Sequence, residues 1–170
     1  VLSRLGTIAM DLEDYVSAAK YLNHALDCGV PNLNMYYNLA LAYGNMGQFM
    51  QALIALREAQ NLSTEDVEIN YQMGVAYFEL EMYNDAIENF ITYALENNED
   101  ALVFFLMGQA FMELEDYTSA LGVFQKSLSV NPLDYRTQYY IGQCNYNIEN
   151  YNDAARAFKK ALNINPDDPA

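Results

Sequence analysis

Few side chains in this sequence are of the kinds that bind metals or catalyse reactions. The 170 residues include one histidine, His24, and Cys28 follows it four positions later. On a helix this spacing places two side chains on one face, where both could bind the same metal ion. No second pair of this kind occurs in the sequence, and an ordinary surface pair explains the two residues as well. We therefore expect neither a metal nor a cofactor.

Sequence motifs of catalytic sites are also missing. The chain contains no glycine-rich phosphate loop, no Gly-x-Ser-x-Gly elbow and no Cys-x-x-Cys pair. Carboxylates are plentiful, with 23 Asp and Glu residues, but they recur at fixed turn and helix positions instead of forming an isolated pair. We expect that the chain is not an enzyme.

The stretch 107–124 shows which structural elements the sequence predicts. Gly108 and Phe111 lie on one face of a pattern with helical periodicity, which predicts a first helix. Asp116 follows a short turn and is a suitable N-cap for a second helix, whose inner face includes Ala120. Glycine and alanine at these places allow two helices to cross closely. The stretch therefore predicts an antiparallel helix pair.

The same pattern recurs five times at intervals of 34 residues. Each copy has a small residue on the first helix, an aromatic residue opening the second helix, an alanine at the crossing, and a large apolar residue after it. In that order these are Gly6, Ala40, Gly74, Gly108 and Gly142; Tyr15, Phe49, Tyr83, Tyr117 and Tyr151; Ala18, Ala52, Ala86, Ala120 and Ala154; and Leu22, Leu56, Phe90, Phe124 and Phe158.

This period and this helix–turn–helix unit resemble the tetratricopeptide repeat (TPR) family. The resemblance covers essentially the whole chain. It implies an all-α fold, a right-handed superhelical solenoid of antiparallel helix pairs. It also implies a single array with repeats at about 1–32, 33–66, 67–100, 101–134 and 135–168.

The ends of the sequence and its cysteines add three expectations. Residues 167–170 resemble the start of a sixth repeat, so we expect 1–170 to be part of a longer protein. Cys28 and Cys144 lie in the first and last repeats, too far apart in a solenoid for an internal disulfide, and we expect free thiols. The sequence shows no signal peptide and no apolar run long enough to span a bilayer, so we expect a cytoplasmic protein.

In the TPR family the first helices line a concave groove, which implies that their outward side chains bind a partner. These candidates form a groove that is aromatic with amide and acidic edges. They are Tyr37, Asn38, Glu68, Tyr71, Gln72, Phe78, Glu79, Phe105, Gln109, Met112, Glu113, Tyr139 and Tyr146. A second interpretation stays open for the aromatic stripe of Tyr37, Tyr71, Phe105 and Tyr139. These rings could instead pack between neighbouring first helices as part of the core.

Charge is distributed unevenly along the chain, whose formal net charge is −15. Residues 58–125 contain 14 carboxylates and no Lys or Arg. This acidic region could serve solubility alone, or it could attract a cationic partner. Both interpretations disfavour nucleic acid as a partner, because its phosphates would be repelled.

The function that these features predict is a protein–protein interaction scaffold or adaptor. Its partner would be a peptide segment with basic and apolar residues, docked in the concave groove. Two alternatives stay open: a regulatory or targeting module of a larger enzyme, and a unit that self-associates end to end through uncapped ends. A clamp for chaperone C-termini is disfavoured, because the cationic and amide residues suited to it (Arg4, Asn38 and Arg136) are scattered.

Overall fold

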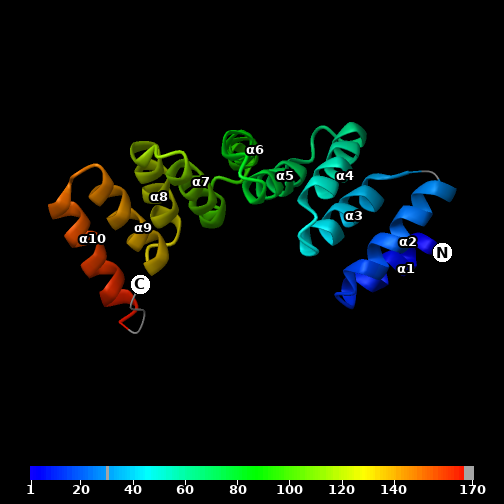
Figure 1. Cartoon of the computed structure of the whole chain (residues 1–170), viewed down its shortest axis with the longest axis horizontal. Helices are drawn as coiled ribbons and strands as arrows, with labels where there is room; N and C mark the ends of the chain where they lie inside the picture. Colours follow the sequence, from blue (N-terminus) through cyan, green and yellow to red (C-terminus); the bar gives the residue numbers. More distant parts are fainter. Residues whose placement is uncertain (30, 167–170) are drawn as a thin grey trace. The chain divides into compact units, whose positions relative to one another are not determined.

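The structure, a computed structural model, describes residues 1–29 and 31–166, and these form ten α-helices and no strand (Figure 1). The helices are α1 (Leu2–Asp11), α2 (Tyr15–Cys28), α3 (Leu33–Asn45), α4 (Phe49–Leu62), α5 (Val67–Glu79), α6 (Tyr83–Glu96), α7 (Ala101–Glu113), α8 (Tyr117–Val130), α9 (Tyr135–Asn147) and α10 (Tyr151–Ile164).

The helices belong to two compact units, Val1–Asn89 and Phe90–Ala170, and the boundary between the units falls within α6. In the first unit α1 packs with α2 and α3 with α4, while α2 contacts α3 and α4 contacts α5. In the second unit α7 packs with α8 and α9 with α10, and α8 contacts α9. The predicted all-α fold of tandem helix pairs is confirmed.

Carboxylates and amides begin many of these helices. Asp116 accepts a hydrogen bond from the backbone N–H of Ser119 at 3.1 Å, as predicted for an N-cap. Hydrogen bonds from Ser119 lower the pKa of Asp116. Asn32, Asp66, Asp100 and Asp134 cap the first helices of the later pairs in the same way. Part of the acidic composition therefore has a structural role.

The turn inside each helix pair contains a residue with left-handed backbone geometry. Its φ angle is 57° at Glu13, 71° at Gly47, 60° at Glu81, 58° at Glu115 and 64° at Glu149. Glycine adopts this geometry without strain, whereas a side chain such as glutamate does so at a cost. One of the five turns therefore has the residue that the backbone favours, and four do not.

Close packing of the paired helices requires the small residues that the sequence repeats. A Cβ added to Gly108 would lie 2.4 Å from a ring carbon of Phe124, and one added to Gly142 would lie 2.5 Å from Phe158. Ala120 and Ala154 of the second helices are buried. These residues let the two helices of a pair approach closely.

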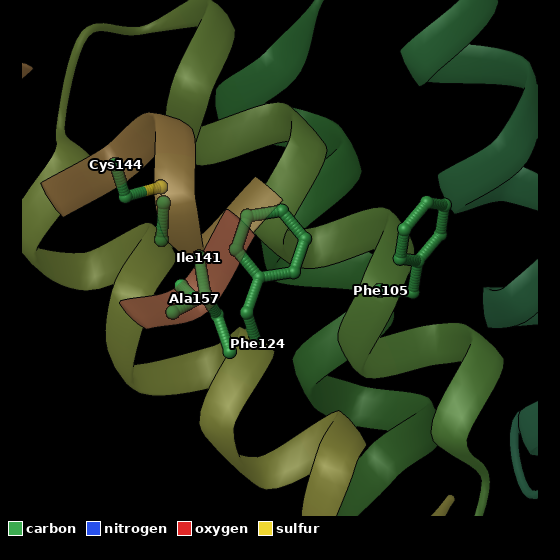
Figure 2. Close-up of a cluster of buried hydrophobic side chains, with 6 residues drawn as sticks. Phe105, Phe124, Ile141, Cys144 and Ala157 are labelled. Carbon is green, nitrogen blue, oxygen red and sulfur yellow. The ribbon is translucent and has the colours of Figure 1, made fainter. Parts of the chain in front are cut away.

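The core of the second unit combines residues from four helices (Figure 2). Phe105 of α7, Phe124 of α8, and Ile141 and Cys144 of α9 belong to it, together with alanines of α8 and α10. Phe124 and Cys144 are completely buried. The core thus joins two successive helix pairs and fixes the relative positions of α7 and α9.

The structure gives further observations on the cysteines, on helix length and on clusters of possible metal ligands. Cys28 and Cys144 are free, and burial raises the pKa of the Cys144 thiol to about 11. No helix among the described residues is long and apolar enough to cross a membrane. Within the same part of the chain, no three His, Cys, Asp or Glu side chains converge as a metal site would need. The predicted start of a sixth repeat, 167–170, lies outside the described residues.

Candidate functional site

The candidate residues of the second unit line two pockets. The larger pocket, of about 730 Å³, is lined by Phe105, Gln109 and Tyr139, among others. The smaller one, of about 470 Å³, is lined by Met112, Glu113, Tyr139 and Tyr146. All six residues predicted in this unit therefore face one of the two pockets, and Tyr139 faces both.

Hydrogen bonds and ring contacts hold the aromatic walls of these pockets in place. Gln143 donates a hydrogen bond to the Tyr139 hydroxyl at 3.1 Å, and Gln109 donates one to the Tyr140 hydroxyl at 3.3 Å. The Tyr139 ring also packs against Phe158, with 5.4 Å between the ring centroids. The rings are thereby ordered without a ligand, which lowers the entropy cost of binding one.

Phe105 belongs to both the core and the larger pocket. It is 9% exposed and contacts Phe124 and Tyr140. Tyr139 is half-buried, while Tyr146 is 60% exposed and contacts Tyr151. The two interpretations of the aromatic stripe thus apply to different residues, with Phe105 mainly core and Tyr139 on the pocket surface.

Sequence reasoning did not assign the other walls of the larger pocket to the site. They come from α9, from α10 and from the residue that follows α10, and they are Tyr135, Arg136, Tyr140, Phe158, Ala161, Leu162 and Asn165. Phe158 occupies the repeat position of Phe124, yet it is partly exposed whereas Phe124 is fully buried. The repeat register alone assigns both residues to the core, so it does not predict that Phe158 is more exposed than Phe124.

Each pocket contains one charged side chain. In the larger pocket this is Arg136, whose Nε lies 3.4 Å from Asp134 Oδ1 and whose guanidinium lies 5.5 Å from the centre of the Phe105 ring. In the smaller pocket it is Glu113, which is exposed at the end of α7. The two pockets therefore offer opposite charges to a ligand.

In the first unit, three candidate residues meet where α3 faces α5. Burial and, less strongly, the nearby Glu68 carboxylate together raise the pKa of Tyr37 to about 12, while a hydrogen bond with Gln72 has the opposite effect. Gln72 also lines a pocket of about 220 Å³, together with residues of α3 and α4. Tyr37, Glu68 and Gln72 thus form one polar–aromatic cluster.

The other candidates of the first unit have different surroundings. Asn38 and Tyr71 are half-buried. Phe78 packs edge-on against Tyr83 at 5.5 Å between centroids, and Glu79 is exposed at the end of α5. The predicted residues therefore form two separate sets, one in each unit.

Comparison with known proteins places this arrangement in a family. Family models described as tetratricopeptide repeats match residues 33–66 and 105–169. No curated protein matches the sequence significantly. A crystal structure of MamA is similar with a TM-score of 0.89 at 22% identity, covering 95% of both chains. A fragment of MamA from Desulfovibrio magneticus RS-1 reaches a TM-score of 0.91 at 16% identity, covering 99% of this chain and 96% of that one.

At these identities the MamA structures show the shared fold. TPR repeats support a protein-interaction scaffold, and such a fold is typically non-catalytic. The family models match two segments, and the described residues form paired helices that repeat every 34 residues. The chain therefore belongs to the tetratricopeptide repeat family.

Proposed function

We propose that this TPR scaffold binds a peptide segment of a partner protein along its first helices. Apolar side chains of the peptide enter the pockets, and its basic residues face the carboxylates of the first helices. The observation that carries the proposal is the placement of Phe105, Gln109, Met112, Glu113, Tyr139 and Tyr146, all of which line the two pockets of the second unit.

The shape and composition of the pockets suit side chains of a peptide. Both pockets have tyrosine walls, whose rings contribute apolar contact area; the hydroxyls of Tyr139 and Tyr140 accept hydrogen bonds from Gln143 and Gln109 and can still donate one. Tyr139 and Phe158 line both pockets, so neighbouring side chains of one peptide could occupy the two. Because the tyrosine rings are already held by Gln109 and Gln143, most of the ordering cost falls on the peptide.

The carboxylates of the first helices support a preference for peptides whose basic residues lie away from Arg136. Glu68, Glu79 and Glu113 belong to first helices, in the region 58–125 that has no Lys or Arg. A Lys or Arg over an aromatic ring gains about 0.5–2 kcal/mol, depending on desolvation. Carboxylates beside the rings add an attraction that salt weakens, because the Debye length is about 8 Å at physiological ionic strength.

A peptide array probed with the 170-residue chain tests this function. We expect peptides with alternating basic and apolar residues to bind, and their binding to weaken as salt is raised from about 50 to 500 mM. Tyr146→Ala should weaken binding, whereas Ile54→Ala should not, since Ile54 is 61% exposed on a second helix and Tyr146 is 60% exposed. If no peptide binds, or if both variants bind equally well, the function is wrong.

A second candidate function, self-association, has one specific observation in its favour. Leu5 and Ile8 of α1 are 38% and 52% exposed, whereas their counterparts Leu39 and Ala42 on α3 are buried. The same face of α1 could pack against another copy of the chain. Sedimentation of wild type and Ile8→Glu tests this: a concentration-dependent oligomer that the variant abolishes supports it, and a wild-type monomer at high concentration excludes it.

A further inference from the structure

Gly44, near the end of α3, is a helical glycine that neither packing nor backbone geometry requires. A Cβ added there would meet no atom within 4 Å, and the φ angle of Gly44 is not in the left-handed region. By contrast, a Cβ added to Gly108 or Gly142 would clash with a ring of the paired helix. Glycine also destabilises a helix relative to alanine. The packing of the chain therefore does not explain the absence of a side chain at position 44.

The other four repeats have a large side chain at this position. In chain order these residues are Met10, Phe78, Met112 and Tyr146. The two aromatic ones pack edge-on against the tyrosine that opens the following helix. Phe78 lies 5.5 Å from Tyr83 between centroids, at 72°, and Tyr146 lies 5.5 Å from Tyr151, at 67°. In the second repeat Gly44 offers no ring for such a contact.

A pocket of about 220 Å³ lies beside Gly44, and we call it the Gly44 pocket. Phe49, which opens α4 as the tyrosines open the later helices, is half-buried and lines it. The pocket extends to Ala40 and Ala52, the buried residues of the helix crossing. Residues of α3, α4 and α5 form its walls. The helix pairs before and after it are both described, so the opening is a property of this repeat.

The fourth repeat shows what a side chain at this position does. Met112, the counterpart of Gly44, lines the smaller pocket of the second unit. The lining of that pocket does not include Gly108 or Ala120, the residues of its helix crossing. Met112 packs against the core that contains Ala120. A side chain at this position therefore covers the crossing, and Gly44 leaves it accessible.

The Gly44 pocket has the size and composition to bind one aromatic side chain. An apolar cavity of about 150 Å³ is large enough for benzene, so a pocket of about 220 Å³ can hold a single ring. Its lining is apolar apart from the amides of Asn45 and Gln72. A bound ring could pack edge-on against Phe49, an arrangement that aromatic pairs favour.

Charge around the pocket favours a basic residue next to that ring. Glu79 is exposed on α5, one helical turn after Val75, which lines the pocket. Asp11 is exposed at the same repeat position on α1. Both α1 and α5 contact α3, and packed helices lie about 8–10 Å apart. The first helices of this unit carry three carboxylates and one cationic residue, Arg4.

We propose that the Gly44 pocket binds an aromatic side chain of the partner peptide, which packs edge-on against Phe49, and that a Lys or Arg within two residues of this ring faces Glu79. Phe78 and Tyr146 are the templates for the ring, since they make this contact in their own repeats. The inference rests on the proposed peptide-binding function and names the side chain that the first unit selects.

A subtractive selection tests the proposal. A displayed library of random 16-residue peptides is depleted on immobilised Gly44→Phe and then selected on the wild-type chain. We expect enriched peptides in which Phe, Tyr or Trp lies within two residues of Lys or Arg. An enriched synthetic peptide should bind Gly44→Phe at least about tenfold more weakly than wild type. Gly122→Phe is the matched control, because Gly122 is also helical with nothing within 4 Å of an added Cβ, and it should leave binding unchanged.

Thermal melts and a changed peptide show whether the new ring occupies the pocket. Gly44→Phe, and Gly44→Met with the residue of the fourth repeat, should melt no lower than wild type, because the space is free and glycine is the poorer helix former. Replacing the aromatic residue of the peptide by Ala should weaken binding to wild type about tenfold. The same replacement should barely affect binding to Gly44→Phe, since that variant already excludes the ring.

A charge exchange tests the contact with Glu79. Glu79→Lys should weaken the enriched peptide, and replacing the basic residue of the peptide by Glu should restore binding to this variant. Glu58→Lys is the matched control, because Glu58 is exposed on α4, a second helix, and makes the same change in net charge. Equal effects of the two variants would mean that only the overall charge matters and that Glu79 makes no direct contact.

The remaining outcomes separate the pocket from the function. If no peptide binds the wild-type chain before depletion, the peptide-binding function is wrong. If peptides bind but none remains after depletion on Gly44→Phe, the Gly44 pocket is not used and the function stands. If Gly44→Phe and Gly44→Met both melt clearly below wild type, the space is not free and the inference is wrong. If the chain alone forms an oligomer that Gly44→Phe abolishes, a second copy occupies the pocket and the partner peptide is overturned.

Discussion

Gly108 of α7 and the ring of Phe124 of α8 are in such close contact that no larger residue fits at position 108. A Cβ there would stand 2.4 Å from a ring carbon, and Phe124 is enclosed by Phe105 and Tyr140 on its other sides. A shift of the ring would therefore disturb its contacts with Phe105 and Tyr140. The distance between the two helices, and with it the position of Phe105 in the larger pocket, depends on this glycine.

The first prediction follows from that contact. Gly108→Ala should lower the free energy of unfolding by about 1–3 kcal/mol, because overpacking forces the ring or the helix to shift. Gly122→Ala, on the same helix pair, should instead raise it by about 0.5–1 kcal/mol, since nothing lies within 4 Å of the added Cβ and alanine favours the helix. Urea denaturation of both variants measures the difference. Equal effects of the two changes would contradict the contact.

The second prediction concerns the strained turns. Glu115 has a φ of 58°, a geometry that disfavours side chains with a Cβ. Glu115→Gly should therefore raise the free energy of unfolding by up to about 1 kcal/mol. Gln125→Gly, at an exposed position in the interior of α8, should lower it by about 1 kcal/mol, because glycine weakens a helix interior. A loss of stability in the first variant would show that the glutamate side chain makes contacts that outweigh the strain.

The sequence predicted the helix pairs well because the same residue types recur at one period. Small residues at the positions of Gly108 and Ala120, and large ones at that of Phe124, mark the crossing of two helices in each repeat. The left-handed turns were not predicted, because Gly47 has the expected residue type and four glutamates do not. Their geometry follows from joining two closely packed helices, a constraint that local sequence preference does not contain.

The positions of the candidate residues, though not their role, can be compared with the structure. First-helix residues such as Tyr139 and Met112 face the pockets, as the repeat register implies. The register could not separate Phe105 from Tyr139, which share one repeat position but differ in burial, because burial depends on neighbouring pairs. For the same reason it assigned Phe158 to the core, although the structure places that ring in a pocket wall.

A third prediction tests the crossing alanine. Ala120 is completely buried, so Ala120→Leu should overpack the contact between α7 and α8 and lower the free energy of unfolding by about 1–3 kcal/mol. Thr118→Leu, two residues earlier and exposed, should change it by less than about 0.5 kcal/mol. Thermal melts of both variants provide the measurement. If both substitutions are equally harmful or equally tolerated, the assigned helix faces are wrong.

The last prediction concerns the pH dependence of stability. Burial, with Glu68 nearby, raises the pKa of Tyr37 from 10.0 to about 12 in the folded protein. Between these values the unfolded chain loses the Tyr37 proton while the folded protein keeps it, so the free energy of unfolding falls as pH rises. Below pH 10 the hydroxyl is protonated in both states and this dependence disappears. Tyr37→Phe should therefore lose stability less steeply than wild type between pH 10 and 12.

The test compares urea denaturation of wild type and Tyr37→Phe at several pH values across that interval. Because the chain contains 15 tyrosines, the informative quantity is the difference between the two proteins rather than either curve alone. Tyr146→Phe is the control, since Tyr146 is 60% exposed on α9. Loss of its hydroxyl should leave the change of unfolding free energy with pH the same as in wild type. If Tyr37→Phe and wild type keep a constant difference from pH 9 to 12, the Tyr37 hydroxyl is not buried beside Glu68 in the folded protein.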